Sequence, residues 1–273
     1  GIPYTPRPIA QHILDHIPVE NLSPSQRYAA DIACGSGSFL LAATQRLRGV
    51  FDARESGAED NVVRHLRQHV IGNDMDSVAI LVTKLIYLLE HWISRSERRD
   101  VPEPEQLWEE DALSLAEADF GEARPSIVVG NPPFARTAGG HQLANRFLVK
   151  SLELLKPGGY LGIIMPGSLL KMHRQKGQET RQRLLESCEL LEVWEQPLGV
   201  VGLTARQETC VLIARKRDES EKCQQAVVFK STYSSRRAAV QALREDLRST
   251  WTFAASGLPG RPDVPWVADE EHR

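Results

Sequence analysis

The sequence has few cysteines, no long apolar run and almost no net charge, and each shortage narrows the possible protein classes. Four cysteines occur among the 273 residues, scattered without paired spacing: Cys34, Cys188, Cys210 and Cys223. This pattern fits a reducing cytoplasm and no zinc site, so no metal is expected. The longest apolar stretches, around residues 79–89 and 161–170, are too short to span a bilayer. There is no signal peptide, and no membrane association is expected.

A formal net charge of −3 argues against a protein that holds nucleic acid by bulk charge alone. Any such binding would need a local basic face. The length allows one large α/β domain or two small ones. Because the chain begins at Gly1 rather than at a methionine and enters a patterned segment at once, we expect it to be a piece of a longer protein.

Apolar strand-like runs alternate with helical patterns, which is typical of a doubly wound sheet. Strands are expected at 28–33, 70–72, 126–130, 160–165, 190–195, 208–214 and, in the tail, 226–230. Helices are expected at 9–17, 38–47, 78–92, 142–155, 178–187 and 236–247, and an acidic loop at 100–110. The short connection between the strands at 190–195 and 208–214 predicts a hairpin, and hence one antiparallel strand in an otherwise parallel sheet.

The tetrapeptide Asn131-Pro132-Pro133-Phe134 follows the apolar strand at 126–130 and is the most informative motif. An exocyclic amine on a purine is a poor nucleophile, because its lone pair is delocalised into the ring. An enzyme that methylates it must therefore fix the nitrogen by hydrogen bonds. The Asn131 side-chain oxygen and the Pro132 carbonyl can accept such bonds, the two prolines restrict the backbone, and Phe134 offers a flat surface to the ring. The motif predicts chemistry on a planar amine; the alternative is an ordinary strand-to-loop turn.

Glycines stand between a strand end and a helix start in the segment 31–37, DIACGSG. A doubly wound sheet binds its nucleotide at this kind of position. Gly35 and Gly37 let the backbone approach a ligand closely, and Asp31 is an acidic residue that could bind a cationic amine. The alternative is again an ordinary turn.

Acidic residues follow the next strands in the same way. Asp74 comes after the strand at 70–72, where a ribose diol would lie, whereas Asp76 is as well explained as a helix N-cap. Asp111 follows the third strand region and could accept a hydrogen bond from an adenine amino group. Each residue alone is typical of a cap or a loop charge, and their joint placement favours a nucleotide site.

In this order, the motifs resemble those of the S-adenosylmethionine-dependent adenine-N6 DNA methyltransferases of the gamma arrangement. In that family an N-terminal cofactor motif, here YTPRPIA at 4–10, precedes the glycine motif and then the catalytic tetrapeptide. The resemblance covers about residues 1–216. It implies an α/β, Rossmann-like class I methyltransferase fold, with a mostly parallel seven-stranded sheet, one antiparallel strand and helices on both faces.

The resemblance also implies the cofactor contacts. Tyr4 and Thr5 would reach the methionine end of S-adenosyl-L-methionine, Asp74 the ribose and Asp111 the adenine, with Phe147 beside that adenine. The expected cofactor-binding residues are Tyr4, Thr5, Asp31, Ala33, Gly35, Gly37, Asp74, Met75, Asp111, Ala112 and Phe147.

The expected mechanism is direct methyl transfer to adenine N6. The target base would be flipped out of the duplex and stacked on Phe134, and its amine would donate hydrogen bonds to Asn131 and Pro132. Cytosine C5 methylation would need a nucleophilic cysteine, and none of the four lies in a Pro-Cys context after the fourth strand.

Three alternatives remain open. The same tetrapeptide occurs in enzymes that methylate guanine N2 of ribosomal RNA and in enzymes that methylate a protein glutamine. The segment Tyr4-Thr5-Pro6, joined directly to the sheet, looks like the DNA enzymes instead. The third alternative is a cofactor-binding subunit that is inactive without a partner.

DNA contacts are expected from basic residues near the catalytic loop and after the fifth strand, although such a run also fits a solvated helix face. These residues are Arg136, Lys171, His173, Arg174, Lys176, Arg181 and Arg183. We expect residues 1–217 to form the catalytic domain and 218–273 to be an extension, which could begin a target-recognition domain. The expected partners are DNA, a specificity subunit or recognition domain, and a nuclease of a restriction-modification or phage-defence system.

Overall fold

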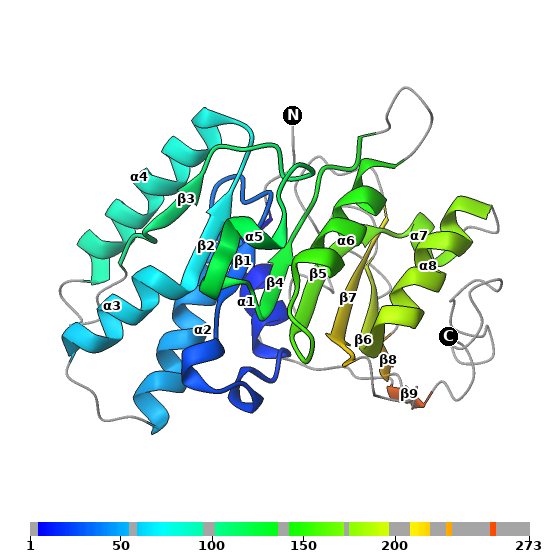
Figure 1. Ribbon diagram of the computed structural model, residues 1–273, viewed down its shortest axis with the longest axis horizontal. Coiled ribbons are helices and arrows are strands. Elements are labelled where there is room, and N and C mark those ends of the chain that lie inside the picture. Colours follow the sequence, from blue (N-terminus) through cyan, green and yellow to red (C-terminus); the bar gives the residue numbers. More distant parts are fainter. Residues whose placement is uncertain are drawn as a thin grey trace.

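In the computed structural model, the strands form one mixed sheet with helices on both faces (Figure 1). The structure describes residues 5–54, 59–94, 102–135, 142–171, 175–196, 208–218, 228–230 and 252–254. The order of the described strands across the sheet is β3-β2-β1-β4-β5-β7-β6-β8-β9. Since β1 and β4 are neighbours, the chain first winds outward from β1 to β3 and then returns to the other side of β1.

The strands are short at the β3 end of the sheet and longer around β5, β6 and β7. Their bounds are β1 Ala29–Asp31, β2 Val70–Asn73, β3 Gln106–Trp108, β4 Ile127–Gly130, β5 Tyr160–Pro166, β6 Cys188–Gln196, β7 Thr209–Lys216, β8 Val228–Lys230 and β9 Thr252–Ala254. All seven residues of β5 are buried, which is expected for a central strand covered on both faces.

Strand directions confirm the expected topology of the first seven strands. Strands β3, β2, β1, β4 and β5 pair in parallel, and β7 runs antiparallel to both β5 and β6. The hairpin of β6 and β7 is thus the source of the single antiparallel strand in this part. Beyond it, β8 pairs in parallel with β6, and β9 pairs antiparallel with β8. These two strands extend the expected seven-stranded sheet; β8 is the tail strand expected at 226–230, and β9 was not expected.

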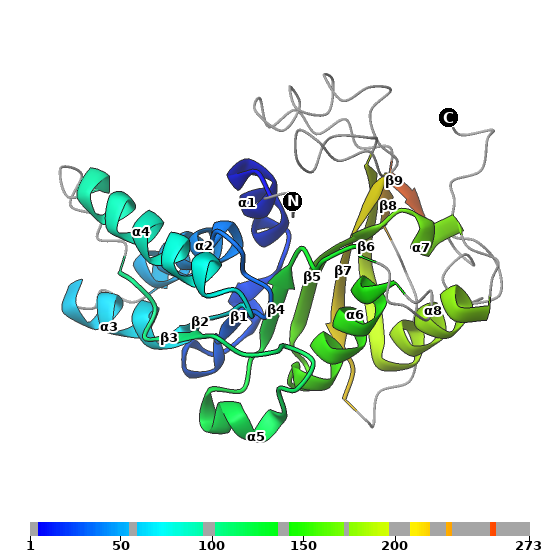
Figure 2. The same cartoon turned by 90° about the horizontal axis from the view of Figure 1, so that it is seen from above.

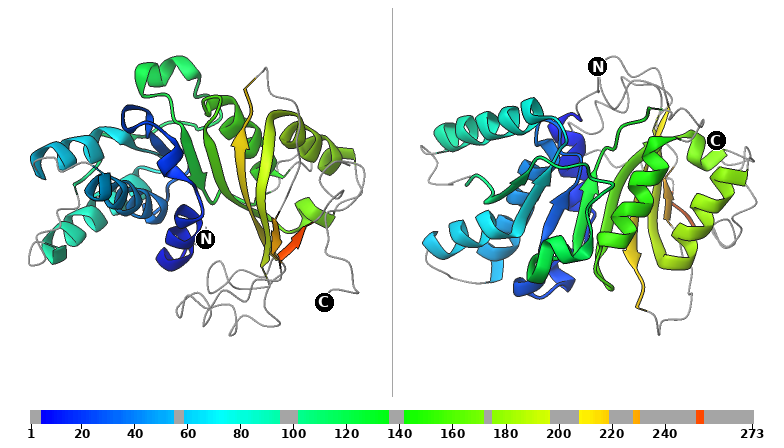
Figure 3. Two further views of the ribbon diagram at one scale, coloured as in Figure 1. Left: turned by 90° about the horizontal axis from the view of Figure 1, so that it is seen from below. Right: turned by 45° about the horizontal axis from the view of Figure 1, so that its top comes forward.

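Of the described helices, four pack on one face of the sheet and four on the other. Figure 2 shows the sheet between these two layers. On the first face lie α1 Arg7–Asp15, α2 Ser38–Arg54, α3 Glu59–His69 and α4 Ser77–Ser94. On the second lie α5 Glu117–Phe120, α6 Leu143–Leu154, α7 Ser168–Lys171 and α8 Gln175–Ser187. Short 3-10 turns occupy Val19–Asn21, Pro24–Gln26 and Gly121–Ala123. Figure 3 shows the same two helical layers from below and obliquely.

The sequence prediction missed α3 and β3, and also the short elements α5, α7 and β9. The segment 100–110, expected to be an acidic loop, contains β3, whose side chains are only half-buried and which pairs through the backbone with β2. A three-residue edge strand needs no apolar run, so periodicity gives no signal for it. The tail strand expected at 226–230 is present as β8 over its last three residues. The helix expected at 236–247 lies outside the described residues.

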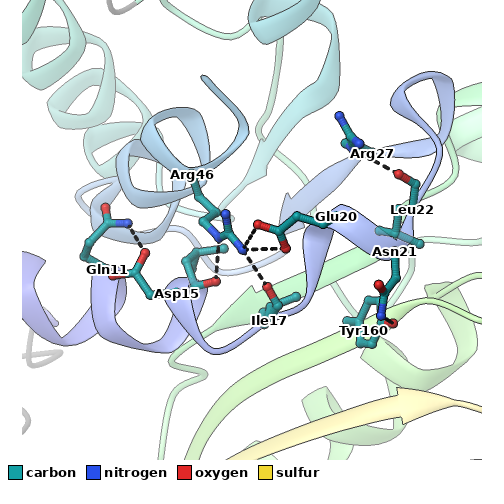
Figure 4. A network of polar contacts seen from close by, with 10 residues as sticks. Gln11, Asp15, Ile17, Glu20, Asn21, Leu22, Arg27, Arg46 and Tyr160 are labelled. Atoms are coloured by element: carbon teal, nitrogen blue, oxygen red, sulfur yellow. Dashed lines mark hydrogen bonds and ion pairs between the residues drawn. The ribbon is translucent and has the colours of Figure 1, made fainter. Parts of the chain in front are cut away.

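A partly buried polar network fixes α1 to α2 (Figure 4). The Arg46 guanidinium of α2 donates to the carbonyl oxygens of Leu14 and Ile17, at 3.3 and 3.2 Å, and to the Glu20 carboxylate at 2.8 Å. These two carbonyls also accept from the backbone amides of Ile17 and Val19, so Arg46 adds a second hydrogen bond to each of them just after α1. At the other end of α1, Arg7 forms an ion pair with Glu90 of α4. Because both ends of α1 are held, the residues just before it have a defined place beside the sheet.

Candidate active site

The candidate site lies at the carboxyl ends of β1, β2 and β4. The strand order reverses between β1 and β4, so the loops after these two strands diverge and leave room for a ligand between them. The three strands end at Asp31, Asn73 and Gly130, so the predicted glycine, acidic and catalytic motifs all follow strands that end at this edge. The sequence prediction of where these motifs fall in the fold is confirmed.

Hydrogen bonds hold the glycine loop after β1 in one conformation. The Gly35 amide donates to the Asp74 carboxylate at 2.9 Å, and the Thr83 hydroxyl of α4 donates to the Gly35 carbonyl at 2.9 Å. Gly37 has a φ of +77°, and a Cβ there would lie 2.8 Å from the Thr83 methyl group. Only glycine fits at this position, because a side chain would be strained by the backbone and by Thr83.

Asp31 is a buried carboxylic acid at the end of β1. Its side chain is 2% exposed and accepts a hydrogen bond from the Ala33 amide at 3.0 Å. Burial raises the pKa of Asp31 to about 7, and the nearby Asp74 carboxylate adds to the rise. A Cβ on Gly130 would lie 2.8 Å from Asp31 Oδ1, so the strand that carries the catalytic motif approaches this acid closely. A cationic ligand would offset the cost of ionising Asp31 in this position.

Asn131 uses only one end of its side-chain amide in hydrogen bonds to the described residues. Its Nδ2 donates to the hydroxyl of Thr5 at 3.1 Å, a contact between residues 126 positions apart in the chain. Its Oδ1 is buried and accepts no hydrogen bond from any described residue. A buried acceptor without a donor costs about 1–3 kcal/mol, so this oxygen marks a position where a ligand donor would be stabilised.

Packing restricts the motion of the other residues of the tetrapeptide. Pro132 is buried, and Phe134 is half-buried. Phe134 packs against the two apolar clusters that lie on opposite faces of the sheet. The ring is therefore held by its surroundings, which suits a stacking surface better than a freely rotating side chain would.

Asn73, at the end of β2, is a residue that the sequence prediction missed. Its Nδ2 donates to the carbonyl oxygens of Ile32 and Glu110, at 3.1 and 3.0 Å, and its Oδ1 accepts from the Glu110 amide at 3.2 Å. It joins the ends of β1, β2 and β3 into one rim. The only sequence signal was its place beside Asp74 at a strand end.

Asp74 and Asp76 take different roles. The Asp74 carboxylate accepts from the amides of Gly35 and Asp76, at 2.9 and 3.0 Å, so it supports the glycine loop. Asp76 Oδ1 accepts from the Val78 amide at 2.9 Å, which confirms it as the N-cap of α4. Met75, between them, is 76% exposed.

Only some of the residues expected around the cofactor adenine lie together in the structure. Ala112 and Phe147 are buried in one apolar cluster with Ile32, close to the rim. Asp111 is exposed, and its Oδ1 accepts from the Leu113 amide at 3.0 Å, as in an ordinary Asx turn. Tyr4 lies outside the described residues.

The expected DNA surface is corrected at one residue. Arg181 is fully buried in α8, and its guanidinium donates to the Leu169 carbonyl at 2.7 Å, so it serves packing rather than phosphate contact. Arg183 on the same helix is exposed. Lys171 and Lys176 lie in α7 and α8, but the structure does not describe their side chains. Arg136, His173 and Arg174 lie outside the described residues.

Two further kinds of feature are absent from the described ranges. No three His, Cys, Asp or Glu side chains there are grouped so that they could hold a metal ion. Among the described helices, none combines the length and apolarity that crossing a membrane requires.

The fold and the site define a class I methyltransferase architecture, with a glycine loop after β1 and an Asn-Pro-Pro-Phe motif after β4. The sequence matches the family described as N-6 DNA Methylase over residues 1–248. The chain belongs to this family.

Two curated relatives are Type II enzymes. RM.Eco57I of Escherichia coli, a restriction enzyme and methyltransferase, is 22% identical over 246 residues, which cover 69% of this chain and 24% of the relative. M.BanIII of Aneurinibacillus aneurinilyticus, a methyltransferase, is 26% identical over 218 residues, which cover 71% of this chain and 35% of the relative. The chain thus spans about a quarter to a third of these relatives.

A solved structure with the same fold is the ATP-dependent Type ISP restriction-modification enzyme LlaBIII bound to DNA. It superposes with a TM-score of 0.69 at 14% identity, over 90% of this chain and 21% of that one. At this identity the similarity establishes the fold.

Proposed function

We propose that the chain is the catalytic part of a DNA methyltransferase that transfers a methyl group from S-adenosyl-L-methionine to adenine N6. The observation that carries the proposal is the buried Oδ1 of Asn131, to which no described residue donates a hydrogen bond. Thr5 accepts a hydrogen bond from Nδ2 of the same amide, so the oxygen is directed away from Thr5 as a fixed acceptor. An amine that donates to this oxygen would be held with its lone pair free for attack.

The cofactor would bind along the rim formed by the ends of β1 and β2. It supplies an electrophilic methyl group when bound. Asp31 would face its positively charged methionine end, and the glycine loop would allow close backbone approach. Asp74 would hold the ribose, with Tyr4, Thr5, Met75, Asp111, Ala112 and Phe147 as further contacts. Asp74 would keep its bond to Gly35 in doing so, since a carboxylate can accept several hydrogen bonds.

The target adenine would be flipped out of the duplex and stacked on Phe134. Its N6 hydrogens would be donated to Asn131 Oδ1 and to the Pro132 carbonyl. These bonds would weaken the amine's conjugation with the ring and direct its lone pair toward the methyl group, so the rate gain would come from orientation and electrostatics. Once N6 has gained the methyl group, it would lose one of its protons to water. No covalent enzyme intermediate is needed, and the buried thiols of Cys34, Cys188 and Cys210 have no role.

The alternatives are disfavoured by the family to which the chain belongs. N-6 DNA Methylase describes DNA enzymes, whereas the ribosomal RNA and protein-glutamine alternatives rest on the tetrapeptide alone. The curated relatives are several times longer than the matched segment, so we expect further domains or subunits to act with this chain. RM.Eco57I combines restriction and methylation in its name, so we expect a nuclease and a recognition domain or specificity subunit to act with this chain on DNA in the cytoplasm.

Residues 1–217 would form the catalytic domain, with 218–273 as an extension that adds β8 and β9 to the sheet edge. Phosphate contacts are expected from Arg136, Lys171, Arg174 and Lys176.

The test is product identification. The chain is incubated with S-adenosyl-L-methionine labelled in its methyl group and with unmethylated genomic DNA, ribosomal RNA or release-factor protein in parallel. We expect label in DNA alone, recovered after digestion as N6-methyldeoxyadenosine, and none with the Asn131→Ala control. Label in RNA or protein alone, or in cytosine, would overturn the proposal.

A further inference from the structure

Helix α4 presents a long apolar stripe to solvent. Six of its large apolar side chains are 49% to 76% exposed: Val78, Leu81, Leu85, Leu88, Leu89 and Trp92. Together with Met75 just before the helix, they are all of the large apolar residues that are exposed in the described part of the chain. The apolar surface of the described residues is therefore concentrated on one helix, at the β3 end of the molecule (Figures 1 and 2).

Contacts on the opposite side of α4 fix the orientation that exposes the stripe. The opposite side of α4 is anchored, because Ile80 and Tyr87 pack in the core and the Thr83 hydroxyl donates to Gly35. The Tyr87 hydroxyl shares a 2.9 Å hydrogen bond with Thr44 of α2, and Glu90 pairs with Arg7. The rotation of α4 about its axis is fixed, and the stripe must point outward.

The spacing of the stripe is that of a helix–helix contact. Val78, Leu81, Leu85, Leu88 and Trp92 follow at intervals of three, four, three and four residues, the seam of a coiled coil. Such a seam is stable in water only when another helix covers it. Surface helices of monomers normally place polar residues at these positions.

The stripe matches itself when a second helix runs in the opposite direction. Counted from Leu85, apolar residues lie four and seven positions before it, at Leu81 and Val78, and four and seven after it, at Leu89 and Trp92. A twofold axis near Leu85 would place the small Val78 against the large Trp92 of the other copy, and Leu81 against its Leu89, which lies beside the seam. The remaining seam residue, Leu88, would face the half-buried Val82. This is the self-complementarity that a twofold interface requires.

The size of the patch also fits a dimer. The exposed parts of the six side chains amount to on the order of 700 Å² per copy, near the roughly 800 Å² per partner of a standard interface. We propose that two copies of the chain associate through α4, with the helices antiparallel and the twofold axis near Leu85.

Lys84 predicts how the stability of this dimer depends on salt. It is exposed beside Leu85, so the axis would bring the two Lys84 side chains near each other. Their repulsion is screened by salt, and apolar burial is not weakened by it. The dimer should therefore become tighter as the NaCl concentration rises. A foreign helix with an acidic residue facing Lys84 would show the opposite trend.

The first test is the mass of the full chain in solution, by light scattering after gel filtration and by sedimentation equilibrium. We expect twice the chain mass of 30.5 kDa at micromolar concentration. Leu85→Glu should weaken association by roughly 100-fold or more, because two carboxylates would be buried against apolar surface. Lys84→Gln is the matched control one residue away and should dimerise at least as well as the wild type. Circular dichroism checks that both variants are folded.

The second test fixes the geometry without relying on a destabilised variant. Leu85→Cys should cross-link to itself on mild oxidation, and a mixture of Val78→Cys and Trp92→Cys chains should cross-link to each other. A monomeric wild type, or a dimer that survives Leu85→Glu and gives none of these cross-links, would contradict the proposal. Binding of the monomer to phosphatidylglycerol vesicles instead would assign the stripe to a membrane surface, and would also overturn it.

Discussion

The orientation of a single amide decides whether the site can accept a proton-bearing amine. Asn131 can present its oxygen to a substrate only if its nitrogen is occupied elsewhere, and Thr5 provides that acceptor. Thr5 is 7% exposed and lies just before α1, so its place depends on the network that fixes α1. Besides its expected role at the cofactor, we expect Thr5 to position the Asn131 amide.

Replacing Thr5 tests this positioning role. Thr5→Val keeps the shape but removes the acceptor, so the Asn131 amide is free to rotate and we expect kcat to fall about 10- to 100-fold. Thr5→Ser keeps the hydroxyl and should restore most of the rate. Steady-state kinetics separate the two roles. A higher KM for S-adenosyl-L-methionine with an unchanged kcat would mean that Thr5 acts only at the cofactor.

Asp31 predicts a pH dependence of cofactor binding. Its pKa is raised to about 7 in the empty protein, mainly by burial. Because this lies above the unfolded value of 3.8, protonation stabilises the empty fold at low pH, and that stabilisation is lost as the pH rises to about 7. A cationic ligand favours the ionised form, so below pH 7 its binding must release a proton. Affinity should therefore rise with pH and level off above 7.

Calorimetry of S-adenosyl-L-methionine binding, in buffers of different ionisation enthalpy, measures that proton directly. Asp31→Asn should bind more weakly and lose the pH dependence between pH 5 and 7. Glu122→Gln, a change at an exposed acid, should behave as the wild type. A wild-type affinity that is flat over this range would rule out Asp31 as the partner of the cation.

Secondary-structure elements contribute to the site through their ends. The strands β1, β2 and β3 place three loops side by side, and Asn73 bonds to the first and third of them. The glycine loop is supported in turn by Asp74 from the second loop and Thr83 from α4. The strand ends are therefore coupled, and a substitution at one of them should alter the conformation of the others.

Asn73→Ala tests this cooperation between strand ends. The change leaves the Ile32 carbonyl and the Glu110 backbone groups without their partner, so we expect a loss of about 2–4 kcal/mol in the free energy of unfolding. Cofactor affinity should fall as well, because the loops that carry Asp31 and Asp111 loosen. Urea denaturation and calorimetry measure the two effects, with Gln68→Ala on α3 as an exposed control. Unchanged stability would show that the rim does not depend on Asn73.

For the molecule as a whole, the sequence predicted the order of motifs and the sheet well, because both depend on local patterns. Glycine turns, apolar strands and the tetrapeptide are each contained in a few consecutive residues. Contacts between distant residues could not be predicted in this way. The bond from Asn131 to Thr5, the three bonds of Asn73 and the burial of Arg181 against Leu169 arise only when the chain is folded. Arg181 was wrongly assigned to the DNA surface because its helix carries other basic residues.

The fold places the groups expected to bind the cofactor and those expected to bind the methyl acceptor on different strands. The ends of β1 and β2 carry the groups expected to hold the cofactor, and the end of β4 carries those expected to hold the methyl acceptor. The most direct test of this division is to measure cofactor affinity and methyl transfer on the same Asn131→Ala protein. We predict affinity for S-adenosyl-L-methionine within about twofold of the wild type and transfer to adenine N6 reduced by at least about 100-fold. Near-normal transfer in this variant would contradict the account.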